Sequence, residues 1–522
     1  MEFIRVYDKK LYCGDEPILL RGFGLGGWLL PEGYMWKLYK SCDRPRRMEK
    51  MISDLCGNTY AERFWKSYYE SYITEEDIRF IAGQGFNCVR LPINSRHLYK
   101  YENEEVIFCE DTVRLIDNCV KWCKNQGIYV ILDMHGAPGG QTGQNIDDSE
   151  NDLPELFTQP QNQKELTELW RKLAKRYAHE AAVAGYDLLN EPLPEWHNKY
   201  NDMLIPLYEK LIEAIRLEDK NHIIILEGAH WATDFSIFKN WQPPQGEANL
   251  LLQFHKYWSP PDEESLKHFF QARSELSLPL FMGEGGENNT NWYTAVFPLY
   301  EKLNISWSFW SYKKMDNTNS PITFPVPDGW DRLINFLEGG ESLTEKEAIA
   351  VFNSFLHAIG QCQINMDVIR AVKRVPELNI PCEFFDDFGV SGERPAGAIL
   401  RMDTPVNIQF SNGNNVIPDY NRYGGEAQKD EENLVVILNE TDWVSYNFNA
   451  ESQGMYFISV DTLKKGRLRV ECGGSTQAFE VDGNCELKTS SLLLTPGKHS
   501  VKLLCECGTI ALDNVYIRNA KV

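Results

Sequence analysis

The first 375 or so residues of the chain alternate between short apolar runs and longer stretches with helical spacing. Several of the runs are apolar almost throughout, which is typical of parallel strands that are buried on both faces. The eight runs are residues 18–29, 86–93, 128–135, 184–190, 222–227, 250–257, 280–284 and 305–310. Eight strand-then-helix units predict an α/β fold, a (β/α)8 barrel.

The stretches between the runs carry helix signals. Thr74-Glu-Glu-Asp77 is a capping-box start, and residues 110–126 and 161–178 have helical spacing. Three connections are unusually long, and they cover residues 31–72, 136–152 and 312–330. All three follow strands, so we expect them at the C-terminal rim of the barrel, where active-site loops lie.

The pattern changes after about Pro381. A mostly helical stretch, 341–375, gives way to short alternating runs that are punctuated by turn signals such as Asn412-Gly413. This pattern predicts an all-β sandwich of the jelly-roll kind. We therefore place a catalytic barrel domain at residues 1–375 and a β-sandwich domain at 383–522.

Composition narrows the class of ligand. The 522 residues include 53 Lys and Arg against 75 Asp and Glu, a net charge of −22, which argues against nucleic acid or anionic lipid as a partner. No uncharged apolar run approaches the ~20 residues of a membrane span. The first ten residues lack an apolar signal core, so we expect a cytoplasmic protein, or a secreted one if a leader was removed. The 13 cysteines show no zinc-ribbon spacing, and we expect reduced, mostly buried thiols.

Polar residues stand at the ends of four of the apolar runs. The fourth run ends in Asn190-Glu191-Pro192, and the seventh ends in Glu284 between glycines. His135 ends the third run, and His255 with Tyr257 ends the sixth. The ends of parallel barrel strands converge on one face, so two glutamates there can flank one bond, as the cleavage of a glycoside requires. The alternative for each carboxylate alone is a surface or ion-paired role.

These motifs together resemble glycoside hydrolase family 5, a family of retaining (β/α)8 glycosidases. The resemblance covers roughly residues 15–340, and the motifs fall in the family's order. They are Val89-Arg90-Leu91-Pro92, Asp133-Met134-His135-Gly136, Leu189-Asn190-Glu191-Pro192, His255-Lys256-Tyr257, Gly283-Glu284 and Phe309-Trp310.

The resemblance implies a role for each motif. Glu191 would be the acid/base and Glu284 the nucleophile. The other implied site residues would hold the nucleophile, the sugar hydroxyls and the sugar ring: Arg90 and Tyr257 bond the nucleophile, Asn190 binds the 2-hydroxyl, His135 and His255 hold hydroxyls or the acid/base, and Trp310 is the platform.

Two finer resemblances follow. Glu62-Arg-Phe-Trp65 and residues 135–144 are similar to the exo-β-1,3-glucanase-like branch of the family. The C-terminal region resembles carbohydrate-binding modules of families 6 and 35, in residues 440–446, 454–460, 496–502 and 512–516. Tyr420 and Tyr423 are the better candidates there for stacking on a sugar, and Trp443 and Tyr446 are either core aromatics or stacking residues. The calcium pattern of such modules is not evident, and no metal is expected.

Two further segments need an interpretation. Gly22-Phe-Gly24-Leu-Gly26-Gly27 fits the dinucleotide fingerprint, but Trp28-Leu-Leu-Pro31 follows where a helix should open. We expect these glycines to let the first strand end pass close to the sugar site. In the insert after that strand, Tyr34, Trp36 and Tyr39 are expected to wall one side of the rim; the alternative is that they pack into the barrel's outer layer.

The sequence thus predicts a retaining β-glycosidase that acts without a cofactor on β-glucosidic bonds of small glycosides or oligosaccharides, and that works from chain ends. An endo-acting β-glucanase or β-mannanase and a disaccharide-releasing β-glycosidase are the alternatives within the class. A non-catalytic carbohydrate-binding protein is the alternative outside it. The expected partner is a carbohydrate substrate, and the oligomeric state stays open.

Overall fold

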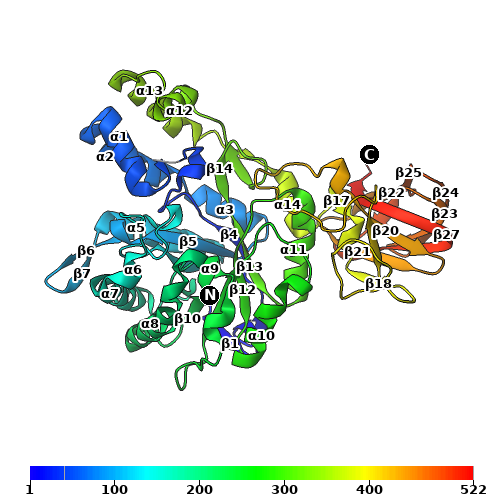
Figure 1. The fold of residues 1–522 in the computed structure, drawn as a ribbon, viewed down its shortest axis with the longest axis horizontal. Helices are drawn as coiled ribbons and strands as arrows, with labels where there is room; N and C mark the ends of the chain where they lie inside the picture. Colours follow the sequence, from blue (N-terminus) through cyan, green and yellow to red (C-terminus); the bar gives the residue numbers. More distant parts are fainter. Residues whose placement is uncertain (40–41, 521–522) are drawn as a thin grey trace. The chain divides into compact units, whose positions relative to one another are not determined.

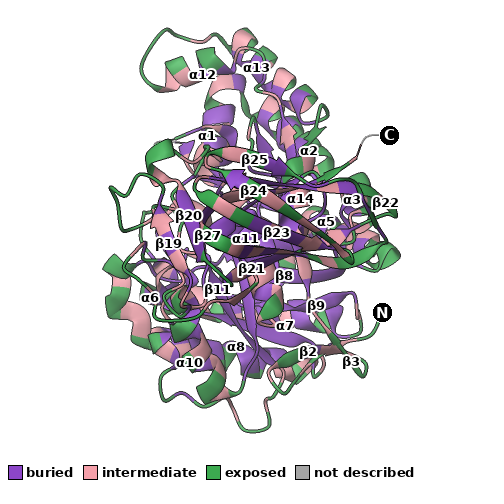
Figure 2. Ribbon diagram, turned by 90° about the vertical axis from the view of Figure 1, so that its right-hand side faces the viewer, coloured by how far each residue is buried: buried purple, intermediate pink, exposed green. Residues whose placement is uncertain are grey.

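The computed structural model describes residues 1–39 and 42–520, which form two compact units. The first unit comprises residues 1–256, 268–286 and 304–364, and the second comprises residues 257–267, 287–303 and 365–522. Figure 1 colours the chain along its sequence. Figure 2 shows the barrel strands as buried segments, as expected for strands covered on both faces.

The first unit is built on a closed barrel of eight parallel strands, as predicted. Each apolar run that the sequence indicates overlaps one of them. The strands are β4 (Arg21–Gly24), β5 (Cys88–Asn94), β8 (Tyr129–Gly136), β9 (Val183–Asp187), β10 (Ile223–Glu227), β11 (Leu250–His255), β12 (Leu280–Gly286) and β13 (Ser306–Trp310).

Helices follow the barrel strands. The predicted capping box is confirmed: Thr74 caps α3, and its backbone N–H and side chain both bond Asp77. The helices are α1 (Pro45–Cys56), α2 (Asn58–Ser71), α3 (Glu75–Gly83), α4 (Ser95–Leu98), α5 (Glu110–Gln126), α6 (Glu155–Thr158), α7 (Pro160–Tyr177), α8 (Leu204–Glu218), α9 (Ala229–Ala232), α10 (Lys267–Leu276), α11 (Thr290–Lys302), α12 (Trp330–Leu337), α13 (Glu345–Ala358) and α14 (Met366–Lys373).

A small N-terminal sheet, which the sequence pattern did not indicate, precedes the barrel. Its antiparallel strands are β1 (Ile4–Tyr7), β2 (Lys10–Cys13) and β3 (Glu16–Ile18). Ile4 and Leu11 join one apolar cluster with residues near the strand starts, such as Cys88 and Ile223. The sheet therefore closes the end of the barrel opposite the strand ends that carry polar residues.

Three long connections lie after strand ends, as expected, and each has local structure. The first contains the 3-10 helix η1 (Gly33–Trp36) with α1 and α2, while its residues 40 and 41 lie outside the described residues. The second holds η3 (Asn145–Asp147), and the third holds β14 (Lys313–Met315) and β15 (Ile322–Phe324), which pairs with β16 (Gln363–Ile364). A further hairpin, β6 (Tyr99–Glu102) and β7 (Glu105–Phe108), follows α4.

The second unit is mainly antiparallel β-structure, as predicted. Its longest strand, β27, pairs with β21 and β23 along its first part and with β17, β20 and β22 along its second. The strands are β17 (Leu378–Pro381), β18 (Asp387–Gly389), β19 (Asn407–Phe410), β20 (Leu434–Asn439), β21 (Trp443–Ala450), β22 (Gly454–Thr462), β23 (Lys465–Cys472), β24 (Ser475–Asp482), β25 (Cys485–Lys488), β26 (Leu492–Leu494) and β27 (Gly497–Asn519).

The division into units differs from the boundary expected at residues 375–383. Two segments that follow barrel strands, 257–267 and 287–303, belong to the second unit. The second of them carries α11, whose Ala295 joins the apolar core of the β-structure. Arg374, just after α14, donates through Nε to the Thr294 carbonyl, 2.6 Å away. Packing in space thus assigns α11 to the unit that follows it much later in the chain.

Among the described residues, no helix has the length and apolar character needed to cross a membrane. All 13 cysteines are free thiols, and eight of them are buried.

Candidate active site

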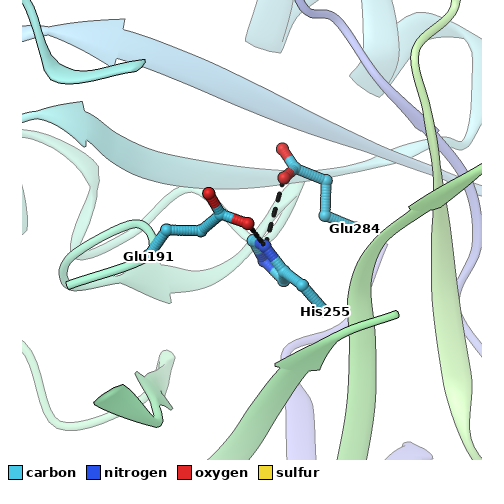
Figure 3. A group of neighbouring side chains, drawn as sticks. All are labelled: Glu191, His255 and Glu284. Atoms are coloured by element: carbon cyan, nitrogen blue, oxygen red, sulfur yellow. Dashed lines mark hydrogen bonds and ion pairs between the residues drawn. The ribbon is translucent and has the colours of Figure 1, made fainter. Parts of the chain in front are cut away.

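Polar side chains from the barrel strands meet at the strand ends. Glu191 follows β9, His255 ends β11, and Glu284 lies near the end of β12. Figure 3 shows the imidazole of His255 between the two carboxylates. Its Nδ1 lies 2.7 Å from Glu191 Oε1 and 3.1 Å from Glu284 Oε2. The sequence prediction that these strand ends converge is therefore confirmed by geometry.

The two glutamates are close and almost buried. One oxygen of Glu191 and one of Glu284 lie within 4.8 Å of each other, and the side chains belong to residues that are 9% and 4% exposed. The same two atoms and a nitrogen of His255 offer three ligand positions to a metal ion. The hydrogen bonds with His255 already account for their closeness.

The surroundings split the proton affinities of the pair. Burial, together with the charges of Glu284 and Glu227, raises the pKa of Glu191 above its ordinary value. Burial also acts to raise the pKa of Glu284, but the neighbouring His255 and Arg90 outweigh it and lower this pKa to about 2. One carboxyl thus tends to keep a proton and the other to stay ionised, the division that acid and nucleophile need.

Arg90 of β5 is fully buried and surrounded by carboxylates. Its guanidinium donates to Asp187 through Nε at 2.8 Å and to Glu284 through Nη1 at 3.1 Å. Its Nη2 lies 3.2 Å from Asp133 and 3.1 Å from Glu227. Four acidic groups therefore share one fixed cation, and each loses part of its charge compensation to the others.

Glu227, at the end of β10, is a site residue that the sequence reasoning did not single out. It is completely buried, and its Oε2 accepts the backbone N–H of Glu191 at 2.7 Å. Its Oε1 accepts from Arg90 and from Gln253 Nε2, and lies 3.5 Å from His255 Nε2. The sequence did carry a signal for Glu227. It is the single charged residue at the end of the apolar strand Ile223–Glu227, the same pattern that indicated Glu191 and Glu284.

The backbone at Glu191 is itself unusual. Its φ is +43°, in the left-handed region that side chains with a Cβ rarely adopt. The bond to Glu227 fixes this peptide, and Leu193, also left-handed at φ +58°, donates its N–H to the Gln141 carbonyl. Strain of this kind persists only where the surroundings hold it.

Asn190 and His135 lie beside the carboxylates. Asn190 Oδ1 accepts from Arg90 Nη2 at 2.7 Å, which leaves its amide nitrogen, 3.5 Å from His135 Nε2, as the group to meet a ligand. His135 Nδ1 lies 2.8 Å from Asp133 Oδ2. The ring of Trp310 is stacked on that of His135, with centroids 5.4 Å apart and an angle of 8° between the planes.

The glycines after the first strand make room for Trp310. A Cβ on Gly24 would lie 2.6 Å from the Trp310 ring, and one on Gly26 would lie 2.7 Å from it. No helix opens directly after β4, as a dinucleotide site would need. The glycines were expected to permit a close approach at the site. They do so for the ring of Trp310, which lies where a Cβ on either glycine would clash with it.

The aromatics of the insert behave differently from one another. Tyr34 accepts the Trp310 indole N–H at 2.9 Å, so it belongs to the site. Trp36 is fully buried and stacks on Trp65, so the expectation that it walls the rim is wrong. Its ring fills the space between the insert helices and Phe355 of α13. Tyr39 is exposed.

The remaining aromatic candidates lie in the second unit. Tyr257 is half-buried directly beyond β11, and its bond to Glu284 stays a prediction. Tyr446 is a core residue, buried and bonded through its hydroxyl to the Cys382 carbonyl. Tyr420 packs against the apolar core, whereas Tyr423 is 43% exposed. Trp443 is half-buried under the ammonium group of Lys502.

Comparison with known proteins agrees with this geometry. A family model described as Cellulase (glycosyl hydrolase family 5) matches residues 53–316. A beta-xylosidase of Phanerodontia chrysosporium is 29% identical over 352 residues, 60% of this chain and 71% of that protein. Endoglucanase C of Acetivibrio thermocellus is 26% identical over 48% of this chain and 88% of its own length. A probable glucan 1,3-beta-glucosidase A of Aspergillus niger is 27% identical over 46% and 55%.

The matched residues make up half of the chain and contain seven of the eight barrel strands, with both glutamates. The chain belongs to glycosyl hydrolase family 5 and is a hydrolase of β-glycosidic bonds.

Proposed function

We propose that the protein is a retaining β-glycosidase that hydrolyses β-glucosidic bonds of small glycosides or oligosaccharides from the chain end. The observation that carries this proposal is the distance of at most 4.8 Å between carboxylate oxygens of Glu191 and Glu284. Retaining enzymes hold their two carboxyl groups ~5–5.5 Å apart, whereas inverting enzymes need ~6.5–9.5 Å to admit a water molecule.

In the first step, Glu284 attacks the anomeric carbon, and the C–O bond to the leaving group breaks as Glu191 gives its proton to the leaving oxygen. In the second step, Glu191 takes a proton from water, whose oxygen displaces Glu284 from the anomeric carbon. The lowered pKa of Glu284 keeps the nucleophile ionised, and the raised pKa of Glu191 favours the protonated acid.

The neighbouring groups have supporting roles in this scheme. Arg90 holds Glu284 by a charged hydrogen bond and holds Asn190 by its side-chain oxygen. The Asn190 amide nitrogen and the His135 ring would bind sugar hydroxyls. Trp310, fixed by Tyr34, would stack on the sugar that is cleaved off.

Action from a chain end is supported by Tyr34. The insert after β4 places this residue against Trp310, so part of the first long connection reaches the site. The name of the glucan 1,3-beta-glucosidase relative implies action from a chain end. The name of the endoglucanase relative implies cleavage within the chain.

A panel of aryl β-glycosides and oligosaccharides tests the proposal, with NMR of the first product and sizing of all products. We expect a β-configured first product and release of one small sugar at a time. An α-configured first product would overturn the retaining mechanism. Products of intermediate length from long glucans would show endo action.

A further inference from the structure

The peptide group between Asn190 and Glu191 is held at both of its polar ends by buried side chains. Its carbonyl oxygen accepts from Nε2 of Gln141 at 2.9 Å, and its N–H donates to Oε2 of Glu227 at 2.7 Å. Gln141 and Glu227 are both completely buried, and all four residues belong to the first unit. Two side chains from separate parts of the chain therefore set the orientation of the peptide that leads into Glu191.

The two hydrogen bonds have opposite polarity, so they suit one orientation of this peptide only. A flipped peptide would place its carbonyl against the carboxylate of Glu227 and its N–H against the NH2 group of Gln141, acceptor facing acceptor and donor facing donor. The flip would also change φ of Glu191, which is +43° and lies in the left-handed region. Because a residue with a Cβ disfavours that region, the bonds to this peptide are needed to keep it.

Gln141 uses every polar group of its side-chain amide on the same region. Its Nε2 also donates to the His135 carbonyl at 2.7 Å, and its Oε1 accepts the N–H of Ala137 at 3.1 Å. Its main-chain carbonyl accepts the N–H of Leu193 at 3.3 Å. Together with the bond to the peptide, these contacts join the end of β8 to the chain before and after Glu191.

The loop that carries Gln141 is fixed by a second buried side chain. Oδ2 of Asp147 accepts the hydroxyl of Thr142 at 2.8 Å and the N–H of Gly143 at 3.0 Å, and its Oδ1 accepts the N–H of Ser149 at 2.9 Å. Asp147 is itself buried. The residues directly after Gln141 are therefore anchored, and the loop holds the Gln141 amide in place before any sugar binds.

We propose that Gln141 is a positioning residue of the hydrolysis, which aims the carboxyl of Glu191 at the leaving oxygen by holding the peptide before it. This inference rests on the proposed function, in which Glu191 gives its proton to that oxygen. A misplaced acid costs most where the leaving group needs the proton most. With a leaving group that departs as a stable anion, the cost should nearly vanish.

The test measures kcat/KM for dinitrophenyl, p-nitrophenyl and phenyl β-glucosides and for a β-linked glucose disaccharide. Gln141→Met keeps the length of the side chain and removes its three hydrogen bonds. We expect kcat/KM to fall about tenfold to a hundredfold for the phenyl glucoside and the disaccharide, and less than about threefold for the dinitrophenyl glucoside. Gln144→Met is the matched control in the same loop and should behave as the parent protein, because the Gln144 amide donates to the adjacent Gly143 carbonyl.

The Glu191→Gln background adds a second criterion. There, Gln141→Met should add less than about twofold to the loss on p-nitrophenyl β-glucoside, since a residue that acts through Glu191 has no acid left to position. Equal losses of Gln141→Met on all substrates, or none on any, would overturn the inference alone. If Glu191→Gln itself loses equally on all leaving groups, the proposed role of Glu191 fails, and the inference falls with it.

A separate measurement distinguishes a misplaced acid from a collapsed site. A 2-deoxy-2-fluoroglucosyl fluoride should label Glu284 with little need for an acid, so Gln141→Met should be labelled completely, as the parent protein is. Gln141→Asn keeps the amide on a shorter side chain and should show the same dependence on the leaving group with smaller losses. Where Gln141→Met is not labelled, Gln141→Asn decides by the same criterion, and equal losses on all substrates would again overturn the inference.

Discussion

The backbone N–H of Glu191 donates a 2.7 Å hydrogen bond to Oε2 of Glu227, a residue fully enclosed at the end of the neighbouring strand β10. The peptide that it holds has left-handed geometry, which costs ~1–2 kcal/mol for a residue with a Cβ. Glu227 therefore fixes the acid/base residue through its main chain and at the same time places a negative charge beside its carboxyl.

Changing Glu227 to Gln should lower kcat/KM by a factor of about 10 to 100, because buried charged hydrogen bonds worth ~1–3 kcal/mol are lost. It should also lower the pKa of Glu191, since the Glu227 charge raises it. The alkaline limb of the pH–rate profile then moves to lower pH. A variant that loses activity with an unmoved profile would show that Glu227 has only a structural role.

Asp187 offers a matched comparison. Burial, with the charge of Glu227, raises its pKa well above the ordinary value, which favours the neutral carboxyl more than in a free aspartate. Within the described residues its Oδ1 has no hydrogen-bond partner. Asp187→Asn keeps the shape and supplies the neutral form that the raised pKa favours, and kcat/KM should change by less than about threefold. A loss as large as that of Glu227→Gln would mean that Asp187 acts as an anion.

The pKa split between the two glutamates predicts the pH dependence of the parent protein. Activity needs Glu284 ionised and Glu191 protonated, so kcat/KM should fall toward alkaline pH as Glu191 loses its proton. On the acidic side it should persist well below pH 4.5, because the pKa of Glu284 is about 2. Initial rates from about pH 3 to about pH 9 check this. A rate that rises steadily with pH would contradict the assignment.

The two catalytic variants should differ in a diagnostic way. Glu284→Gln removes the nucleophile without changing its volume, and turnover should fall by about 10⁴-fold or more on every substrate. Glu191→Gln should cost much less with a good leaving group such as dinitrophenolate, which needs little protonation. Azide should restore part of its activity and yield a β-glucosyl azide. Equal losses on all leaving groups would reverse or abolish these roles.

Glu383 in the second unit predicts a change of stability with pH. Burial raises its pKa to about 8 from the 4.5 of a free glutamate, so the folded state retains the proton more strongly than the unfolded one. The free energy of unfolding should fall as pH rises from about 4.5 to about 8, by on the order of 5 kcal/mol. Glu383→Gln should remove this decline.

Denaturant midpoints of the parent protein and of Glu383→Gln at several pH values measure the effect. Glu486→Gln, an exposed residue on β25, is the matched control and should keep the parent's pH dependence. A decline that survives in Glu383→Gln would assign it to another group.

The barrel could be predicted because a strand buried on both faces leaves an uninterrupted apolar run, as in Ile223–Glu227. The glutamates could be placed because a charged residue at the end of such a run has few structural reasons to be there. Glu227 has the same local signature as Glu284, but no sequence motif marks its bond to a main-chain N–H. Tyr34 and Trp36 lie two residues apart, yet Tyr34 contacts Trp310 of the site and Trp36 is buried among the insert helices. Tertiary packing alone decides which of the two rings is buried.

The N-terminal sheet escaped prediction because its strands have only three or four residues, too short for a clear period. The boundary between the units differs from the predicted one for another reason. Residues 287–303 read as an ordinary barrel helix, and only their contacts with α14 and β17 show which core they complete.

The second unit takes its residues from three separate stretches of the chain. No single break in the backbone can therefore release it intact, and a shortened gene that stops near residue 375 would leave α11 without Phe384 and Asp386, which hold Arg374 against it. Exchange of this module between enzymes by recombination would need five junctions instead of one, because the chain passes between the units five times. A single crossover between residues 257 and 364 would therefore divide the second unit between two genes.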